Sequence, residues 1–283
     1  MVKKHLKIKK AKHSGFCFGV KRAVGRAEDF LKDHKEGYSL GSIIHNPSVV
    51  ERLSEKGLKV IKDINKAKNS HLVIRSHGIS PRLKNKAKAL SICTVDATCP
   101  FVDRSHKIVT KLKKEGYKII IIGQKDHPEV EAILEVAGKG AIAIAKKSDL
   151  SKLNLKNKNI AVIAQTTLSR DKFFEVTTSL LKLDAFECRI FDTICNDVTE
   201  RQKEAKALSK TTDIIIVVGG KVSANTRYLT QICREQGART HHIETDKEIK
   251  RYWFKSVSSV GIVSGASTPS DIIDAVIKKI KSL

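Results

Sequence analysis

Short apolar runs alternate with amphipathic stretches along the chain. The runs are rich in Ile and Val and have the length of buried strands; they lie at 72–74, 119–122, 160–164, 214–218 and 260–263. Stretches with the apolar spacing of helices include 20–31, 102–112, 172–183, 199–208 and 272–280. This alternation predicts an α/β protein built on parallel sheets.

Three cysteines recur in similar surroundings. The segments at Cys17, Cys99 and Cys195 each read Cys-x-x-Val and follow a strand-like or turn segment. An arginine comes next on each predicted helix: Arg22, Arg104 and Arg201. We interpret the three segments as equivalent strand-to-helix junctions.

Two further polar junctions follow each cysteine. A polar residue stands 28 positions after each one: His45, His127 and Ser223. Another polar group follows the cysteines by 60, 67 and 72 positions: His77, Thr166 and Ser267. We therefore expect three pseudo-repeated α/β units, at 1–96, 97–192 and 193–283, each with a small, mainly parallel sheet flanked by helices. Because ligands bind beyond the carboxyl ends of parallel strands, we expect these units to surround a central cavity.

The charge of the chain narrows the choice of partners only slightly. A net charge of +24 attracts anionic substrates, acidic proteins or nucleic acid, and the lysines are spread along the whole sequence. The basic residues lack interleaved aromatics, so nucleic-acid binding is not expected. The apolar runs are too short to cross a membrane, and Met1 to His5 are not followed by the apolar core of a secretory signal. We expect a cytoplasmic protein.

In a reducing cytoplasm, cysteines serve as ligands, nucleophiles or packing rather than as disulfides. None of the six cysteines forms a CxxC pair, so a metal site must be assembled by the fold. Three soft thiolates suit a [4Fe-4S] cluster and leave one iron open to a substrate oxygen. We assign this role to Cys17, Cys99 and Cys195. The other cysteines, Cys93, Cys188 and Cys233, share no such pattern and are expected to be structural.

The remaining polar junction residues suit an anion. Several are expected near helix N-termini, where free N–H groups favour a phosphate or diphosphate: His45, His77, Ser223, Asn225 and Ser267. Glu129 follows His127 by two positions. If Glu129 faces a diphosphate and a developing oxyanion, like-charge repulsion and burial would raise its pKa, as a proton donor requires. Thr166 could orient a substrate hydroxyl or relay the proton. A surface glutamate in a first helical turn and an ordinary helix cap are the competing interpretations.

These residues resemble one known family nearly end to end, the 4-hydroxy-3-methylbut-2-enyl diphosphate reductases, which complete the non-mevalonate isoprenoid pathway. The resemblance rests on Gly15-Phe16-Cys17-Phe18-Gly19-Val20, His45-Asn46, Ser76-His77-Gly78, Asp96-Ala97-Thr98-Cys99-Pro100, Gly123 with His127-Pro128-Glu129-Val130-Glu131, Gln165-Thr166-Thr167-Leu168, Cys195 with Arg201-Gln202, Ser223 with Asn225, and Gly265-Ala266-Ser267.

The resemblance implies an oxygen-sensitive [4Fe-4S] cluster on Cys17, Cys99 and Cys195. It implies reductive removal of an allylic hydroxyl, which gives isopentenyl and dimethylallyl diphosphates plus water, with electrons from reduced ferredoxin or flavodoxin. Glu129 would supply protons and Thr166 would position the hydroxyl. The diphosphate would be held by His45, His77, His127, Ser223, Asn225 and Ser267.

One position departs from the family's pattern. Many members have two adjacent serines where this chain has Ser223-Ala224, so one hydroxyl contact to the diphosphate is missing. Weaker substrate binding, rather than loss of the chemistry, is the expected consequence.

Two other functions fit parts of the same pattern. A zinc-dependent hydrolase of a phosphorylated small molecule could use the three thiolates with Glu129 as base. A cluster-bearing regulator could bind nucleic acid through the basic surface, with strong salt dependence and no turnover of the allylic diphosphate.

Overall fold

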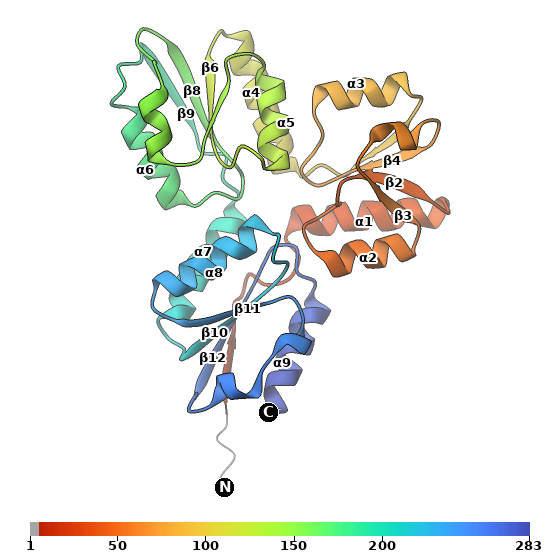
Figure 1. Ribbon diagram of the computed structural model, residues 1–283, viewed down its shortest axis with the longest axis vertical. Coiled ribbons are helices and arrows are strands. Elements are labelled where there is room, and N and C mark those ends of the chain that lie inside the picture. Colours follow the sequence, from red (N-terminus) through yellow and green to blue (C-terminus); the bar gives the residue numbers. More distant parts are fainter. Residues whose placement is uncertain (1–5) are drawn as a thin grey trace. The chain divides into compact units, whose positions relative to one another are not determined.

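The computed structural model describes residues 6–283. Our prediction for the segment from Met1 to His5 therefore lies outside the described residues. Figure 1 labels the main helices and strands along the chain. The strands are β1 (Lys7–Lys10), β2 (Gly37–Leu40), β3 (Leu58–Ile61), β4 (His71–Ile74), β5 (Cys93–Asp96), β6 (Lys118–Ile122), β7 (Ile142–Ile144), β8 (Asn159–Ala164), β9 (Glu187–Phe191), β10 (Ile214–Val218), β11 (Arg239–Ile243) and β12 (Ser259–Ser264).

The α-helices alternate with these strands. They are α1 (Phe18–Asp33), α2 (Pro47–Glu55), α3 (Pro81–Ala89), α4 (Pro100–Lys114), α5 (Pro128–Ala137), α6 (Arg170–Leu180), α7 (Asn196–Ser209), α8 (Ala224–Glu235) and α9 (Ser270–Lys281). Four short 3-10 helices complete the description: η1 (Ile64–Ala67), η2 (Lys147–Lys152), η3 (Asp246–Glu248) and η4 (Arg251–Phe254). No helix among the described residues combines the length and apolar character that a bilayer crossing needs.

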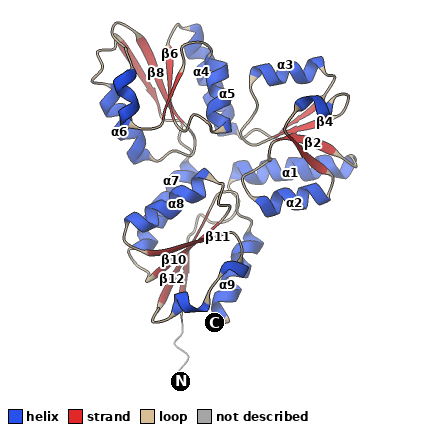
Figure 2. Ribbon diagram, viewed as in Figure 1, coloured by secondary structure: helices blue, strands red, loops and turns tan. Residues whose placement is uncertain are grey.

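The strands form three four-stranded sheets in which every pairing is parallel (Figure 2). Sheet A has the order β1-β12-β10-β11, sheet B the order β3-β2-β4-β5, and sheet C the order β7-β6-β8-β9. The predicted α/β class with three small parallel sheets flanked by helices is confirmed.

The strand that leads to each cysteine lies at the edge of a sheet. β1 pairs with β12, β5 with β4, and β9 with β8. In each sheet, this edge strand pairs with the strand that ends just before the segment around Ser267, His77 or Thr166. We call these three segments the third polar junctions. The pairing therefore brings the cysteine segment next to that junction.

Sheet C has a core on both faces because alternate residues of a strand point to opposite sides. Ile120 and Ile122 of β6 pack with Phe173 of α6. Their neighbours Ile119 and Ile121 pack in the cluster that holds residues of α4 and α5. A strand buried on both faces has no polar positions, which is why β6 reads as an unbroken run of isoleucines.

Sheet A is covered in the same way. Ile214 and Ile216 of β10 pack in the cluster with Val276 of α9. Ile215 and Val217 pack in the cluster that holds residues of α7 and α8. In sheet B, Leu72 of β4 packs in a cluster with residues of η1 and α3.

The chain divides into two compact units, which we describe separately. The sheet A unit contains the described residues up to Lys21, Ile44–Arg52 and Asn196–Leu283. The sheet B–C unit contains Arg22–Ile43 and Leu53–Cys195. The division at 1–96, 97–192 and 193–283, and the central cavity, stay predictions. Strand β1 belongs to the sheet formed by the last third of the chain.

Candidate active site

All three cysteine junctions share one backbone hydrogen bond. The N–H of Cys17 donates to Ala266 O at 3.0 Å. The N–H of Cys99 donates to Ser76 O at 2.9 Å, and that of Cys195 to Thr166 O at 2.9 Å. Each acceptor belongs to a third polar junction, so the edge-strand pairing continues up to the cysteine. This common bond fixes each cysteine beside one of the predicted ligand-binding segments.

The three thiols are reduced and partly exposed. Cys17 and Cys195 directly precede α1 and α7, and Cys99 is the cap residue of α4. The N–H of Val20 points to Cys17 Sγ at 3.4 Å. Burial raises the pKa of the Cys99 thiol, although N–H groups at the start of α4 act in the opposite direction. Positive helix ends favour thiolates, which are the form that binds metals.

Two of the three repeated arginines hold cysteine segments in place. Arg201 is 2% exposed and donates from Nη2 to Gly15 O at 2.9 Å, while its Nε pairs with Asp197 at 2.7 Å. In the sheet B–C unit, Arg22 donates to Thr98 O at 2.6 Å, directly before Cys99. Arg104 is exposed. The repeat of the three arginines in the sequence therefore does not mean that they have the same environment.

Glu129 is the most deeply buried acidic residue of the sheet B–C unit, with 1% of its surface exposed. It lies in the first turn of α5, where Pro128 occupies the first position and His127 caps the helix. Burial raises the pKa of Glu129 to about 7, against the opposing effect of two hydrogen bonds from Thr166. The cause is desolvation, because a carboxylate loses its hydration in the interior.

Thr166 connects Glu129 to Cys195. Its N–H donates to Glu129 Oε1 at 2.7 Å and its hydroxyl donates to Glu129 Oε2 at 2.8 Å. Its carbonyl accepts the hydrogen bond from Cys195. The competing interpretation of Thr166 as an ordinary helix cap is wrong, because α6 begins later and is capped by Ser169.

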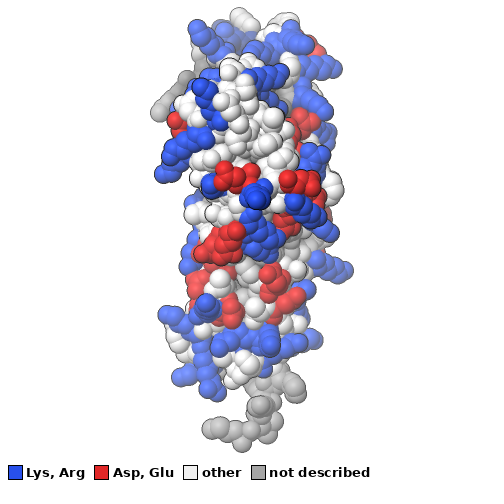
Figure 3. Space-filling model, turned by 90° about the vertical axis from the view of Figure 1, so that its right-hand side faces the viewer, with Lys and Arg blue, Asp and Glu red and all other residues white. Residues whose placement is uncertain are grey.

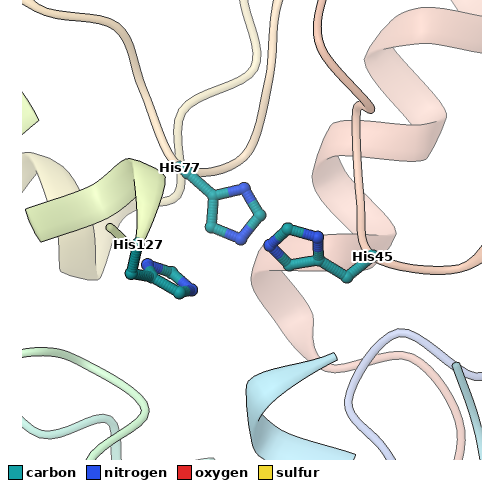
Figure 4. Close-up of side chains that lie close together, drawn as sticks. All are labelled: His45, His77 and His127. Atoms are coloured by element: carbon teal, nitrogen blue, oxygen red, sulfur yellow. The ribbon is translucent and has the colours of Figure 1, made fainter. Parts of the chain in front are cut away.

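His77 and His127 lie together near Glu129. Their rings meet edge to face with centroids 5.5 Å apart. Figure 4 shows His77 on the loop after β4 and His127 at the start of α5. The Nδ1 atom of His127 accepts a hydrogen bond from the Glu129 N–H at 3.2 Å. The sheet B–C unit thus holds six predicted site residues: His77, Cys99, His127, Glu129, Thr166 and Cys195.

The sheet A unit holds another group of predicted site residues. His45, also labelled in Figure 4, precedes α2. Its carbonyl accepts a hydrogen bond from Ser267 Oγ at 3.1 Å. A side chain at Gly220 would come within 2.7 Å of the same carbonyl, so a glycine is required for this close approach. Ser223 caps α8 through a hydrogen bond from the Thr226 N–H at 3.3 Å.

Asn225 is the unusual member of this group. It is 5% exposed, and neither its Oδ1 nor its Nδ2 atom has a hydrogen-bond partner in the described part of the chain. The hydroxyl of the adjacent Thr226 is also buried without a partner. Buried polar groups are nearly always hydrogen-bonded, so two such groups at the start of α8 indicate a place for a polar ligand.

The comparison with known families agrees with this arrangement of cysteines and polar junctions. Residues 8–281 match the model of the family described as LytB protein. The chain belongs to the LytB family.

Relatives that are 40–43% identical to this LytB chain carry the name 4-hydroxy-3-methylbut-2-enyl diphosphate reductase. The protein of Geobacter metallireducens is 43% identical over 96% of both chains. The protein of Pelobacter propionicus is also 43% identical and covers 95% of this chain and 96% of its own. The predicted family and the class of enzyme, an oxidoreductase, are confirmed.

Two solved structures support the same conclusion. A structure described as the terminal enzyme of the non-mevalonate pathway has a TM-score of 0.73 and 38% identity, over 98% of this chain and all of its own. The reductase from Plasmodium falciparum has a TM-score of 0.91 and 30% identity, over 96% of this chain and 87% of its own.

The roles of several residues in this LytB chain were missed or only partly seen in the sequence. Arg201 and Gly15 were noted only as parts of motifs, and Ser264, whose Oγ accepts the Gly15 N–H at 3.0 Å, was not noted at all. The only available signal was their position next to a cysteine junction. Of the cysteines expected to be structural, Cys233 is buried in the core, whereas Cys93 is exposed on β5.

Proposed function

We propose that this protein removes the allylic hydroxyl of (E)-4-hydroxy-3-methylbut-2-enyl diphosphate by reduction and forms isopentenyl and dimethylallyl diphosphates. The observation that carries the proposal is the Glu129–Thr166 pair. A carboxyl group with a pKa of about 7 is partly protonated at neutral pH, as a general acid must be. The names of the relatives supply the substrate.

We propose that Cys17, Cys99 and Cys195 hold a [4Fe-4S] cluster. The donor set fits, because three reduced and partly exposed thiols lie at the starts of three helices, each beside a polar junction. When bound, the cluster would supply electrons and a Lewis-acidic iron. Three protein ligands for four irons leave room for a substrate oxygen.

The reaction has a simple balance. The carbon–oxygen bond breaks, and the hydroxyl oxygen leaves as water after it gains one proton. The allylic fragment takes two electrons and a second proton, and the carbon that receives this proton decides which product forms. Glu129 Oε2, which accepts the Thr166 hydroxyl at 2.8 Å, is the proposed source of protons. The hydroxyl of Thr166 would turn toward the substrate for each proton transfer and would then turn back to Glu129.

The diphosphate would be held by both units. We propose His77 and His127 from the sheet B–C unit, and His45, Ser223, Asn225 and Ser267 from the sheet A unit. The unpartnered amide of Asn225 supports this assignment, because its Nδ2 atom can donate to a phosphate oxygen. The N-terminus of α8 adds backbone N–H groups and a positive dipole end. Ala224 occupies the first position of this helix and contributes no hydroxyl.

The test uses anaerobically purified protein with a reconstituted cluster and photoreduced 5-deazaflavin as a small uncharged reductant. We expect the allylic diphosphate to disappear and both isoprenoid diphosphates to form, as measured by mass spectrometry. A fully loaded protein that forms neither product would overturn the proposal. Release of phosphate without electron consumption, together with zinc in place of iron, would support the hydrolase instead.

Anaerobic spectroscopy of the cluster tests metal and ligand together. Addition of the allylic diphosphate should change the electron paramagnetic resonance spectrum of the reduced protein, whereas inorganic diphosphate should not change it in the same way. We propose a cytoplasmic location, which suits an oxygen-sensitive cluster, and reduced ferredoxin or flavodoxin as electron donor.

A further inference from the structure

A cationic groove runs between α3 and α4 of the sheet B–C unit. It has a volume of about 670 Å³. Its lining contains five lysines and one aspartate, an excess of four positive charges. The lysines are Lys84, Lys88, Lys107, Lys111 and Lys114. We call this feature the α3/α4 groove.

The lysines form two rows because of helical spacing. Lys107, Lys111 and Lys114 are three or four positions apart, so they share one face of α4. Lys84 and Lys88 share one face of α3 in the same way. The side chains of Lys107 and Lys111 are 78% and 77% exposed. Lys107 pairs with Asp103 at 2.8 Å and Lys111 with Glu115 at 3.8 Å, and such exposed ion pairs are weak enough to exchange for the carboxylates of a partner. Figure 3 shows that basic and acidic side chains are interspersed over one face of the molecule.

The groove adjoins one of the proposed cluster ligands. His106 lines it, and the His106 Nε2 atom is buried without a hydrogen-bond partner among the described residues. A Cβ atom at Gly78 would lie 3.6 Å from His106 Cε1 and 3.3 Å from Thr98 Cγ2. The groove wall therefore packs close to Thr98, the residue before Cys99. The helical rise of 1.5 Å per residue puts His106 about 10 Å along α4 from Cys99.

We infer that the α3/α4 groove is the docking surface for an acidic electron-donor protein. The inference rests on the proposed function, since a reductase must receive electrons from outside. The charge of the groove is complementary to an acidic surface, and its position brings a docked redox group toward Cys99. Apart from His106, none of the described residues that line the groove is aromatic, so they offer few of the stacking surfaces that single-stranded nucleic acids use.

The experiment compares two sets of lysines. The groove variant carries Lys107→Gln, Lys111→Gln and Lys114→Gln. The control variant carries Lys278→Gln, Lys279→Gln and Lys281→Gln, three exposed lysines near the end of α9. Both variants lose three charges from a helix, so any general effect of net charge is matched.

Reduced flavodoxin serves as the acidic donor, and the rate of cluster reduction is followed at several salt concentrations. We expect the groove variant to be reduced about tenfold more slowly than the control at low ionic strength, because steering charges act mainly on association. The difference should shrink as salt is added. With photoreduced 5-deazaflavin, which has no charge to steer, both variants should be reduced at the wild-type rate.

Titration of isotope-labelled flavodoxin provides a readout that needs neither turnover nor a cluster. Weaker binding by the groove variant alone would support the inference, even if the allylic diphosphate proved not to be the substrate. Equal binding and equal reduction of the two variants would overturn it. So would an equal loss with 5-deazaflavin, or salt-dependent binding of a short RNA at the groove without binding of flavodoxin.

Discussion

Two buried polar side chains of the proposed site, one in each compact unit, differ in their hydrogen-bond partners. In the sheet B–C unit, the Glu129 carboxylate accepts hydrogen bonds from both the N–H and the hydroxyl of Thr166. In the sheet A unit, the Asn225 amide has no partner for either of its polar atoms within the described residues. An unmade hydrogen bond in the interior costs about 1–3 kcal/mol. The carboxylate of Glu129 is therefore satisfied within its own unit, whereas the unpartnered Asn225 amide supports the proposed ligand contact.

The largest expected effect comes from replacing a cysteine, because the proposed reaction depends on the proposed iron-sulfur cluster. We expect Cys99→Ser to lose iron and to reduce turnover to background, since a serine oxygen is a poor ligand for an iron-sulfur cluster. Iron and sulfide analysis with visible spectroscopy measures the loss. Cys93→Ser, which changes an exposed thiol, should keep both iron and activity. A fully loaded and active Cys99→Ser protein would remove this residue from the ligand set.

Glu129→Gln tests whether the sheet B–C unit supplies the protons. We expect turnover to fall by about 10²- to 10⁴-fold, which is the usual contribution of a general acid. Cluster content and substrate binding should remain, because glutamine has nearly the same shape. The matched control is Glu131→Gln, on the same helix but exposed, which should stay within a few-fold of wild type. Full activity of Glu129→Gln would contradict the assignment of Glu129 as the proton donor.

The buried carboxyl group should also make stability depend on pH. Because the pKa of about 7 in the folded state lies above the ordinary glutamate value of 4.5, the folded state binds more protons between these two pH values. Stability should therefore fall as pH rises from about 4.5 to 7, by up to about 3 kcal/mol. Chemical unfolding of the apoprotein at pH 5 and pH 8 measures this difference. Glu129→Gln should lack this decline; an unchanged decline in the variant would mean that another group causes it.

Asn225→Ala tests whether the sheet A unit is the ligand-binding half. We expect the KM for the allylic diphosphate to rise by about 10- to 100-fold, as for a lost hydrogen bond to a charged group. The melting temperature should fall little, because no hydrogen bond from the Asn225 amide to the described residues is broken. Asn159→Ala, at an exposed position on β8, should leave KM unchanged. A lower melting temperature with an unchanged KM would assign Asn225 a structural role.

The smallest effect is expected from Thr166→Val, which keeps the backbone hydrogen bond to Glu129 but removes the hydroxyl. A hydrogen bond to the carboxylate favours its charged form, so its loss should raise the pKa of Glu129 further. In wild type, activity should fall as pH rises above about 7, where Glu129 loses its proton. In the variant this fall should move to higher pH, with a several-fold lower kcat. An unmoved pH profile would contradict the coupling, and Thr178→Val, at an exposed position of α6, is the control.

Much of this site was predictable because it depends on local patterns. The prediction that burial raises the pKa of Glu129 agrees with the structure. The further rise expected from the like charge of a bound diphosphate stays a prediction. The repeated arginines were visible, but only Arg22 and Arg201 bond to cysteine segments, and Arg104 does not. The sequence shows where each arginine lies along its helix, but it does not show which carbonyl group the side chain reaches.

By itself, the sequence determined the elements and the three cysteine junctions, because apolar periodicity and short motifs act over a few residues. Only the tertiary structure decided that β1 pairs with β12, and that Thr166 bonds to Glu129 across 37 positions of the chain. It also decided that the Asn225 amide is buried without a partner. Edge pairing, desolvation and hydrogen bonding between distant segments depend on which surfaces pack together, and no local pattern records that choice.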